Sequence, residues 1–112
     1  MILAVVGSRD ITDYDLVKNV LDILEFDEIV SGGAIGVDSL AKRYAIENNI
    51  PIKVFLPDWN SYGKQAGFIR NIDIVSYCDK LVSFWNGKSP GTKHSIDIAI
   101  KQGKFLENYM RK

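Results

Sequence analysis

The chain has 112 residues, with 14 basic and 14 acidic side chains and an apolar fraction of 46%. This composition is typical of one small globular domain, and the balanced charge does not fit the one-sided basic surface of a nucleic-acid binder. No apolar run approaches the ~18 residues of a membrane-spanning helix, and residues 2–6 are too short for a signal peptide. The single Cys78 excludes an internal disulfide, so we expect a cytoplasmic protein.

Apolar runs and helical patterns alternate from the start of the chain. Residues 2–6 are apolar throughout and predict a buried strand. A helix follows, for which Thr12 is the expected N-cap and Asp15 completes a capping box. Residues 27–31 predict a second strand, and a second helix begins near Ile35.

The alternation continues in the second half. Residues 52–56 predict a third strand, and residues 57–64 predict an irregular connection. A helix over 66–77 and a strand over 80–85 follow, and Thr92 is the expected N-cap of the next helix.

The end of the chain leaves one alternative open. Gly103 stands where a glycine commonly ends a helix, and Phe105 and Leu106 then form either a short fifth strand or the start of a tail. The alternation predicts an α/β fold, a compact Rossmann-like three-layer sandwich with a parallel sheet of four or five strands, in a single domain over residues 1–112.

Three glycine-rich turns each follow a predicted strand and precede a predicted helix, at residues 7–9, 31–38 and 86–92. The carboxyl ends of parallel strands share one edge of a sheet, where open α/β sheets bind ligands. A glycine turn that leads into a helix directs backbone N–H groups toward an anion. The sequence therefore predicts a pocket for a phosphorylated ligand at this edge.

Residues 63–71 form a further candidate segment, because Gly67 is unfavourable inside a helix and leaves room for close approach. Arg9 and Arg70 suit a phosphate because a guanidinium binds two oxygens at once. The candidate ligand-binding residues are Gly7, Ser8, Arg9, Ser31, Gly32, Gly33, Gly36, Asp38, Arg70, Asn71, Gly87, Ser89, Gly91 and Thr92.

Each candidate also has a purely structural interpretation. Arg9 can pair with Asp10 or Asp13 on the surface, Asp38 can favour the helix dipole, and Thr92 can serve only as a cap. Three aromatic residues beside the loops are candidates for stacking on a base, or alternatively for a packed lid or an interface. They are Trp59, Tyr62 and Trp85.

Other site chemistries lack their motifs. One histidine, His94, and one cysteine cannot build a zinc site, so we expect no metal. Neither the dinucleotide fingerprint nor the P-loop is present, and we expect no cofactor. Residues 1–56 carry 5 basic and 9 acidic side chains (−4), and residues 57–112 carry 9 and 5 (+4), a polarity that favours association of two copies.

Four ordered motifs carry a family resemblance: GSR after the first strand, SGGAIGVD after the second, DWxxYGKxAGxIRN in the middle, and FWNGKSPGT before the last helix. With these motifs the chain resembles the YspA-like branch of the SLOG superfamily over residues 2–104. That superfamily also holds cytokinin-activating phosphoribohydrolases, molybdenum-cofactor carrier proteins and the DNA-processing protein DprA. The resemblance implies a Rossmann-like fold, binding of a nucleotide or nucleotide-derived ligand, and a homodimer or larger homo-oligomer.

The resemblance also bears on catalysis. Phosphoribohydrolases of the superfamily carry a PGGxGTxxE motif whose glutamate assists cleavage of the base–ribose bond, whereas here Gly91 and Thr92 are followed by Lys93, His94 and Ser95. By the resemblance, Arg70 takes the role of the upstream arginine.

We therefore expect a nucleotide-binding sensor or carrier-like domain that contacts neither a membrane nor nucleic acid. The alternative is an N-glycosidase acting on nucleoside monophosphates or ADP-ribose-like compounds, with Asp38 or Asp97 as its carboxylate and Arg70 assisting. A third possibility is DprA-like binding of single-stranded DNA, against which the balanced charge argues.

Overall fold

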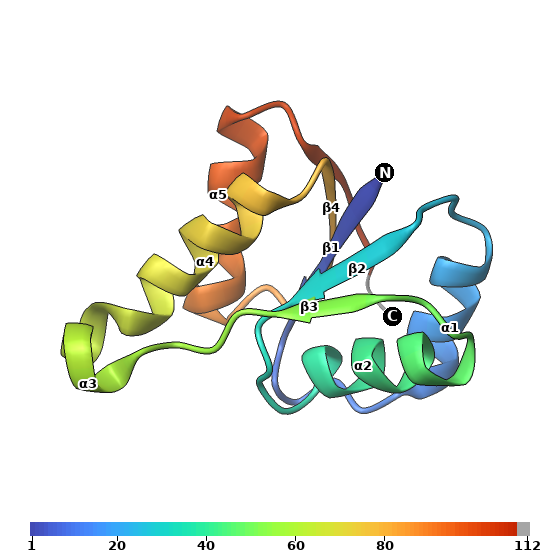
Figure 1. The fold of residues 1–112 in the computed structure, drawn as a ribbon, viewed down its shortest axis with the longest axis horizontal. Coiled ribbons are helices and arrows are strands. Elements are labelled where there is room, and N and C mark those ends of the chain that lie inside the picture. The colour runs from blue at the N-terminus through green and yellow to red at the C-terminus, as the bar shows by residue number, and fades with distance from the viewer. Residues whose placement is uncertain (110–112) are drawn as a thin grey trace.

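Five parallel strands form one sheet in the computed structural model, which describes residues 1–109 (Figure 1). Their order in the sheet is β3-β2-β1-β4-β5. The strands are β1 (Ile2–Gly7), β2 (Glu28–Ser31), β3 (Ile52–Val54), β4 (Lys80–Phe84) and β5 (Phe105–Asn108). The predicted Rossmann-like α/β fold is confirmed, and the fifth strand is present. Residues 110–112 of the predicted domain lie outside the described residues.

Helices cover both faces of the sheet (Figure 1). The helices are α1 (Tyr14–Asp22), α2 (Val37–Glu47), α3 (Trp59–Tyr62), α4 (Ala66–Tyr77) and α5 (Pro90–Lys101). The side chains of β1 alternate between the two faces, because successive residues of a strand point in opposite directions. Leu3 and Val5 pack against α1 and α2, whereas Ala4 and Val6 belong to the core that includes residues of α4 and α5. None of the helices within residues 1–109 has the length and apolarity that crossing a membrane requires.

Two predicted helix caps were wrong. Asp13, not Thr12, caps α1, and its carboxylate accepts a hydrogen bond from the Leu16 N–H at 3.3 Å. Helix α5 begins at Pro90, so Ser89 occupies the N-cap position and Thr92 lies inside the first turn. Proline favours this earlier start because its φ is already helical and it has no N–H to leave unpaired.

Two other boundaries differ from the prediction. The strand predicted over 52–56 ends at Val54, because β3 lies at the sheet edge and its neighbour β2 already ends at Ser31. The connection predicted as irregular contains the short helix α3 and a 3₁₀ turn, Gly63–Gln65. Asp58 caps α3 by accepting from the Ser61 N–H at 3.1 Å.

The strand order creates a crevice beside β1. The chain first places β2 and β3 on one side of β1 and then crosses to build β4 and β5 on the other. Connections therefore leave the carboxyl ends of β1 and β4 in opposite directions, which is where open α/β sheets bind ligands. Gly7 at the end of β1 is in register with Phe84 at the end of β4, so the turns that follow both strands begin at the same level.

Candidate functional site

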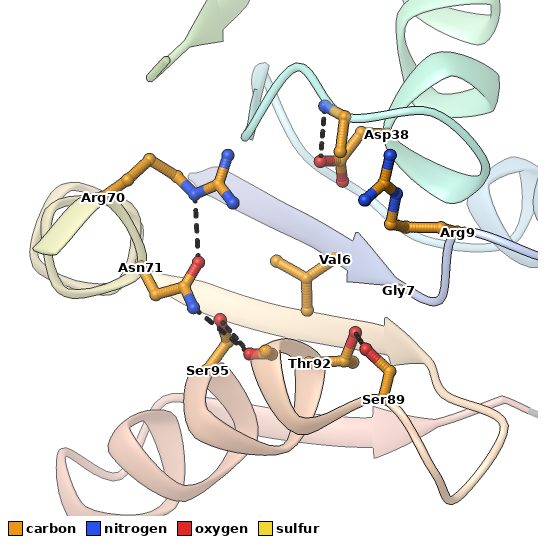
Figure 2. Close-up of a pocket in the computed structure, with 11 residues that line it drawn as sticks. Val6, Gly7, Arg9, Asp38, Arg70, Asn71, Ser89, Thr92 and Ser95 are labelled. Carbon is orange, nitrogen blue, oxygen red and sulfur yellow. Dashed lines mark hydrogen bonds between the residues drawn. The ribbon is translucent and has the colours of Figure 1, made fainter. Parts of the chain in front are cut away.

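A pocket of about 110 Å³ opens at the carboxyl edge of the sheet (Figure 2). Its lining comes from β1, the turns after β1 and β2, and helices α2, α4 and α5. The lining residues are Val6, Gly7, Arg9, Ala34, Asp38, Arg70, Asn71, Ser89, Gly91, Thr92 and Ser95. The volume is below the roughly 300–1,000 Å³ of pockets that enclose a whole small ligand. It matches one polar group of a ligand, such as a phosphate.

Helix α4 places Arg70 at the pocket. The Arg70 Nη1 donates to the Gly32 carbonyl at 2.5 Å, and its Nε donates to the Asn71 side-chain oxygen at 3.0 Å. Burial lowers the pKa of the Arg70 guanidinium, and the nearby Asp38 carboxylate opposes that shift. An arginine still stays charged, because its ordinary pKa exceeds ~12. Arg70 is thus a fixed cation, held on two sides.

Asn71 links α4 to the start of α5. Its side chain is only 6% exposed, and its Nδ2 donates to the Gly91 carbonyl at 3.2 Å. The same Nδ2 lies 3.3 Å from the Nδ1 of His94. Burial lowers the pKa of His94, which favours the neutral ring that can accept this hydrogen bond. Asn71 therefore orients Arg70 and also connects α4 to the first turn of α5.

Arg9 supplies a second cation. It is exposed, lines the pocket, and forms no ion pair within residues 1–109. The surface pairing with Asp10 does not form, because the Asp10 carboxylate instead accepts from the Asn86 side chain at 3.0 and 3.1 Å. Figure 2 shows the guanidinium groups of Arg9 and Arg70 on either side of Val6.

Asp38 contributes the one carboxylate of the pocket lining within the described residues. It is 8% exposed, and its Oδ2 accepts from the Ala34 N–H at 3.0 Å. Burial raises the pKa of Asp38, against the opposing effects of the Ala34 hydrogen bond and the Arg70 charge. A buried carboxylate beside a cation at a pocket is a recognised mark of a functional site.

This burial makes the ionised Asp38 a cost to stability. We expect Asp38→Asn to raise the melting temperature by about 2–6 °C at pH 7, and by less near pH 4. The pKa of Asp38 is higher in the folded than in the unfolded chain, so the folded protein binds more protons between those two pKa values. Its stability therefore falls as pH rises through that window. Asparagine does not ionise, so the stability of the Asp38→Asn protein does not fall in this pH window for that reason.

Thermal unfolding at both pH values measures this effect. Asp97→Asn is the matched control, because Asp97 is exposed and pairs with Lys93 outside the pocket. A melting temperature of Asp38→Asn at pH 7 that is equal to or below that of the unmodified protein would contradict the prediction.

The start of α5 is the anion-favouring end of the pocket. Ser89 makes no capping hydrogen bond with its side chain, and its Oγ instead lies 3.2 Å from the Thr92 Oγ1. The first-turn N–H groups of Gly91 and Thr92 therefore have no side-chain cap, and such groups carry partial positive charge. Both residues line the pocket.

The start of α2 is different from what the glycine pattern suggested. The Val37 N–H donates to the Ser8 carbonyl at 3.4 Å, and the buried Asp38 places a carboxylate at the first turn. Negative charge at this position disfavours a phosphate. The two helix starts thus give the pocket one side that favours an anion and one side that carries an acceptor.

Ser8 and Gly36 support the pocket without lining it. The Ser8 N–H donates to the Phe84 carbonyl at 3.0 Å, and its Oγ accepts from the Asn86 N–H at 3.0 Å. Gly36 has a φ of +79°, and a Cβ there would lie 2.6 Å from the backbone of Ser8 and Arg9. Its role is to let the turn between β2 and α2 lie against the turn after β1.

The remaining predicted residues of the second and third turns lie outside the pocket. Gly32 contacts Arg70 through its carbonyl, whereas Ser31 and Gly33 line a separate cavity beside β3. Gly87 has a φ of +83°, and the space that a Cβ would occupy there is open, so this glycine serves the turn alone.

The three aromatic candidates do not line the pocket. Trp59 and Tyr62 are exposed on α3, which projects from the body of the sheet (Figure 1). Trp85 supports the α5 turn, since its Nε1 donates to the Ser89 carbonyl at 2.9 Å. Stacking of these rings on a base stays a prediction.

Three lining residues were not predicted: Val6, Ala34 and Ser95. Ser95 is one helical turn after Gly91, and its Oγ donates to the Gly91 carbonyl at 3.5 Å. A hydroxyl at that spacing on the inner face of α5 was the available signal. Val6 forms part of the lining because the pocket opens directly above the end of β1.

Comparisons with known proteins show which family the chain resembles in sequence. A family model described as the YspA, cpYpsA-related SLOG family matches residues 1–62, which include the turns after β1 and β2. The Gene 61 protein of Mycobacterium phage D29 is 37% identical over 87 residues, or 72% of this chain and 70% of that protein. No solved structure matches the chain. Arg70 and the α5 turn lie beyond the residues that the family model matches.

Proposed function

Because the chain belongs to the YspA, cpYpsA-related SLOG family, we propose that it binds a nucleotide or a nucleotide-derived phosphorylated ligand. The phosphate would lie between Arg9, Arg70 and the first turn of α5, at the carboxyl edge of the sheet. As a binding domain without a required reaction, it would act as a sensor or a carrier.

The observation that carries this proposal is that two cations, Arg9 and Arg70, line the same pocket as the start of α5, which has no side-chain cap. Arg70 is held by Gly32 and Asn71, so little side-chain freedom is lost when it binds an anion. Arg9 lacks an ion-pair partner in the described part of the chain. Guanidinium groups and first-turn N–H groups are the donors that proteins commonly use for phosphate.

Isothermal titration with AMP and with adenosine tests the proposal. The two probes differ only in the phosphate, so AMP is expected to bind and adenosine to bind far more weakly. Mass spectrometry of small molecules that co-purify with the protein is the complementary measurement. Equal affinity for the two probes, or no detectable binding of any phosphorylated probe, would contradict the proposal.

A second candidate function is N-glycosidase activity on the bound nucleotide, and Asp38 is the observation that favours it. A carboxylate beside the sugar can stabilise an oxocarbenium-like transition state or activate water. Asp97, the other carboxylate considered, is exposed and paired with Lys93, so Asp38 takes this role.

Chromatography for free base after incubation with nucleoside monophosphates tests this candidate. If the protein is an enzyme, base is released, and Asp38→Asn is expected to reduce the rate by at least about 100-fold, within the range for loss of a general acid–base group. Asp97→Asn is expected to keep the full rate. Absence of base release argues for the binding function alone, and release that survives Asp38→Asn would contradict the role of Asp38 as the carboxylate.

A further inference from the structure

A second cavity, of about 360 Å³, lies on the other side of the turn between β2 and α2. Its lining residues are Ser31, Gly33, Ala34, Asp38, Ser39, Lys42, Val54 and Leu56. Ala34 and Asp38 line both this cavity and the smaller pocket. The two spaces are therefore adjacent.

One polar group in this cavity lacks a partner. Ser31 is 1% exposed, and its Oγ makes no hydrogen bond within residues 1–109. Buried hydroxyls are nearly always hydrogen-bonded, and an exception calls for an explanation. The Ser31 hydroxyl favours the charged form of the neighbouring Asp38, although the contact between the two groups falls outside hydrogen-bond geometry. A sugar hydroxyl can both donate and accept, so it satisfies this pair.

Another part of the cavity lining is apolar. Val54 ends β3, and Leu56 follows it with 70% of its surface exposed. Gly33 has a φ of +73°. A Cβ at this position would lie 2.5 Å from the Leu56 Cδ2, so the Leu56 side chain can occupy its position only because residue 33 has no side chain. A flat ring laid on Val54 and Leu56 would remove this apolar surface from water.

We propose that this cavity is the nucleoside subsite of the same ligand, an inference that rests on the proposed phosphate site. Asp38 and Ser31 bind a hydroxyl of the sugar, and Val54 and Leu56 contact the face of the base. The combined space of the two cavities falls within the roughly 300–1,000 Å³ of pockets that enclose a whole small ligand. The 110 Å³ pocket does not reach that range alone.

A series of three probes separates the two sites: inorganic phosphate, ribose 5-phosphate and AMP. In the unmodified protein each added part is expected to increase affinity, by at least about fivefold from ribose 5-phosphate to AMP. Leu56→Ala is expected to remove most of that last gain and to leave ribose 5-phosphate binding unchanged. Ile46→Ala is the matched control, because Ile46 is an exposed apolar residue of α2 outside both cavities.

Ser31→Ala gives an independent measurement. It is expected to weaken ribose 5-phosphate and AMP by about three- to tenfold, the effect of one hydrogen bond, and to leave phosphate binding unchanged. The melting temperature of the ligand-free variant is expected to stay close to that of the unmodified protein, because the hydroxyl makes no contact that meets hydrogen-bond geometry.

The outcomes distinguish failure of this inference from failure of the proposed function. If no phosphorylated probe binds, both the phosphate site and the nucleoside subsite are contradicted. If all three probes bind with the same affinity, or if Leu56→Ala and Ser31→Ala both leave the AMP and ribose 5-phosphate affinities unchanged, the phosphate site stands and the nucleoside subsite is overturned.

Discussion

Arg70→Ala is expected to weaken AMP binding by about 10–150-fold, the effect of losing a hydrogen bond to a charged group worth about 1.5–3 kcal/mol. The magnitude follows from the fixed position of the side chain: Gly32 and Asn71 hold the guanidinium before the ligand arrives. The AMP affinity of Arg70→Lys is expected to fall between the affinities of Arg70→Ala and of the unmodified protein, because lysine keeps the charge but lacks the planar guanidinium. Titration of each variant with AMP gives the dissociation constants.

Two controls keep this measurement specific. Lys88→Ala removes an exposed positive charge from the α5 loop outside the pocket, and its AMP affinity should stay within twofold of the unmodified value. Arg9→Ala removes the exposed cation of the pocket and should weaken AMP with little change in melting temperature. AMP affinity that is insensitive to both Arg9 and Arg70 would remove the basis for a phosphate site here.

Gly36→Ala is expected to lower the free energy of unfolding by about 2–6 kcal/mol, through a backbone strain of ~1–3 kcal/mol and an overpacking cost of ~1–3 kcal/mol. The strain arises because Gly36 combines a φ of +79° with a ψ of −131°, which lies outside the left-handed helical region. The overpacking arises because the new Cβ would lie 2.6 Å from backbone atoms of Ser8 and Arg9, which cannot swing away as a side chain can. Denaturant unfolding measures the loss.

Gly87→Ala is a comparison variant without the overpacking. Gly87 has a similar φ of +83°, but a Cβ there would meet nothing within 4 Å. This variant should therefore lose only the ~1–2 kcal/mol of backbone strain. The larger loss expected for Gly36→Ala comes from its contact with the turn after β1 and from its combination of φ and ψ. Equal losses in both variants would contradict the prediction.

These two predictions concern one junction. The approach allowed by Gly36 brings Asp38 and Arg9 into the same pocket, and Arg70 then bonds the Gly32 carbonyl from the α4 side. A Gly36→Ala protein that still folds should therefore bind AMP less tightly, because the two turns no longer meet at the same distance.

The order of the strands and helices, and the edge of the sheet at which the site lies, follow from local patterns in the sequence. Strand patterns are local, and the right-handed connection of parallel strands leaves few arrangements for five of them. Turns that follow successive parallel strands must then share one edge. This reasoning placed Gly7, Arg9 and Asp38 in one region. Arg70 and Asn71 were predicted separately, from the glycine-containing segment 63–71, and the structure brings all five residues to the same pocket.

The division of that region into an anion-favouring side and an acceptor side depends on packing between residues that are distant in the chain. The buried Asp38 places an acceptor at the start of α2, so the start of α5 is the anion-favouring side, although both helices follow glycine-rich turns. The contributions of Ser95 and Val6, and the separate cavity behind Ser31, likewise depend on which surfaces remain uncovered after packing. Burial and desolvation are set by residues distant in the chain, and a local pattern cannot report them.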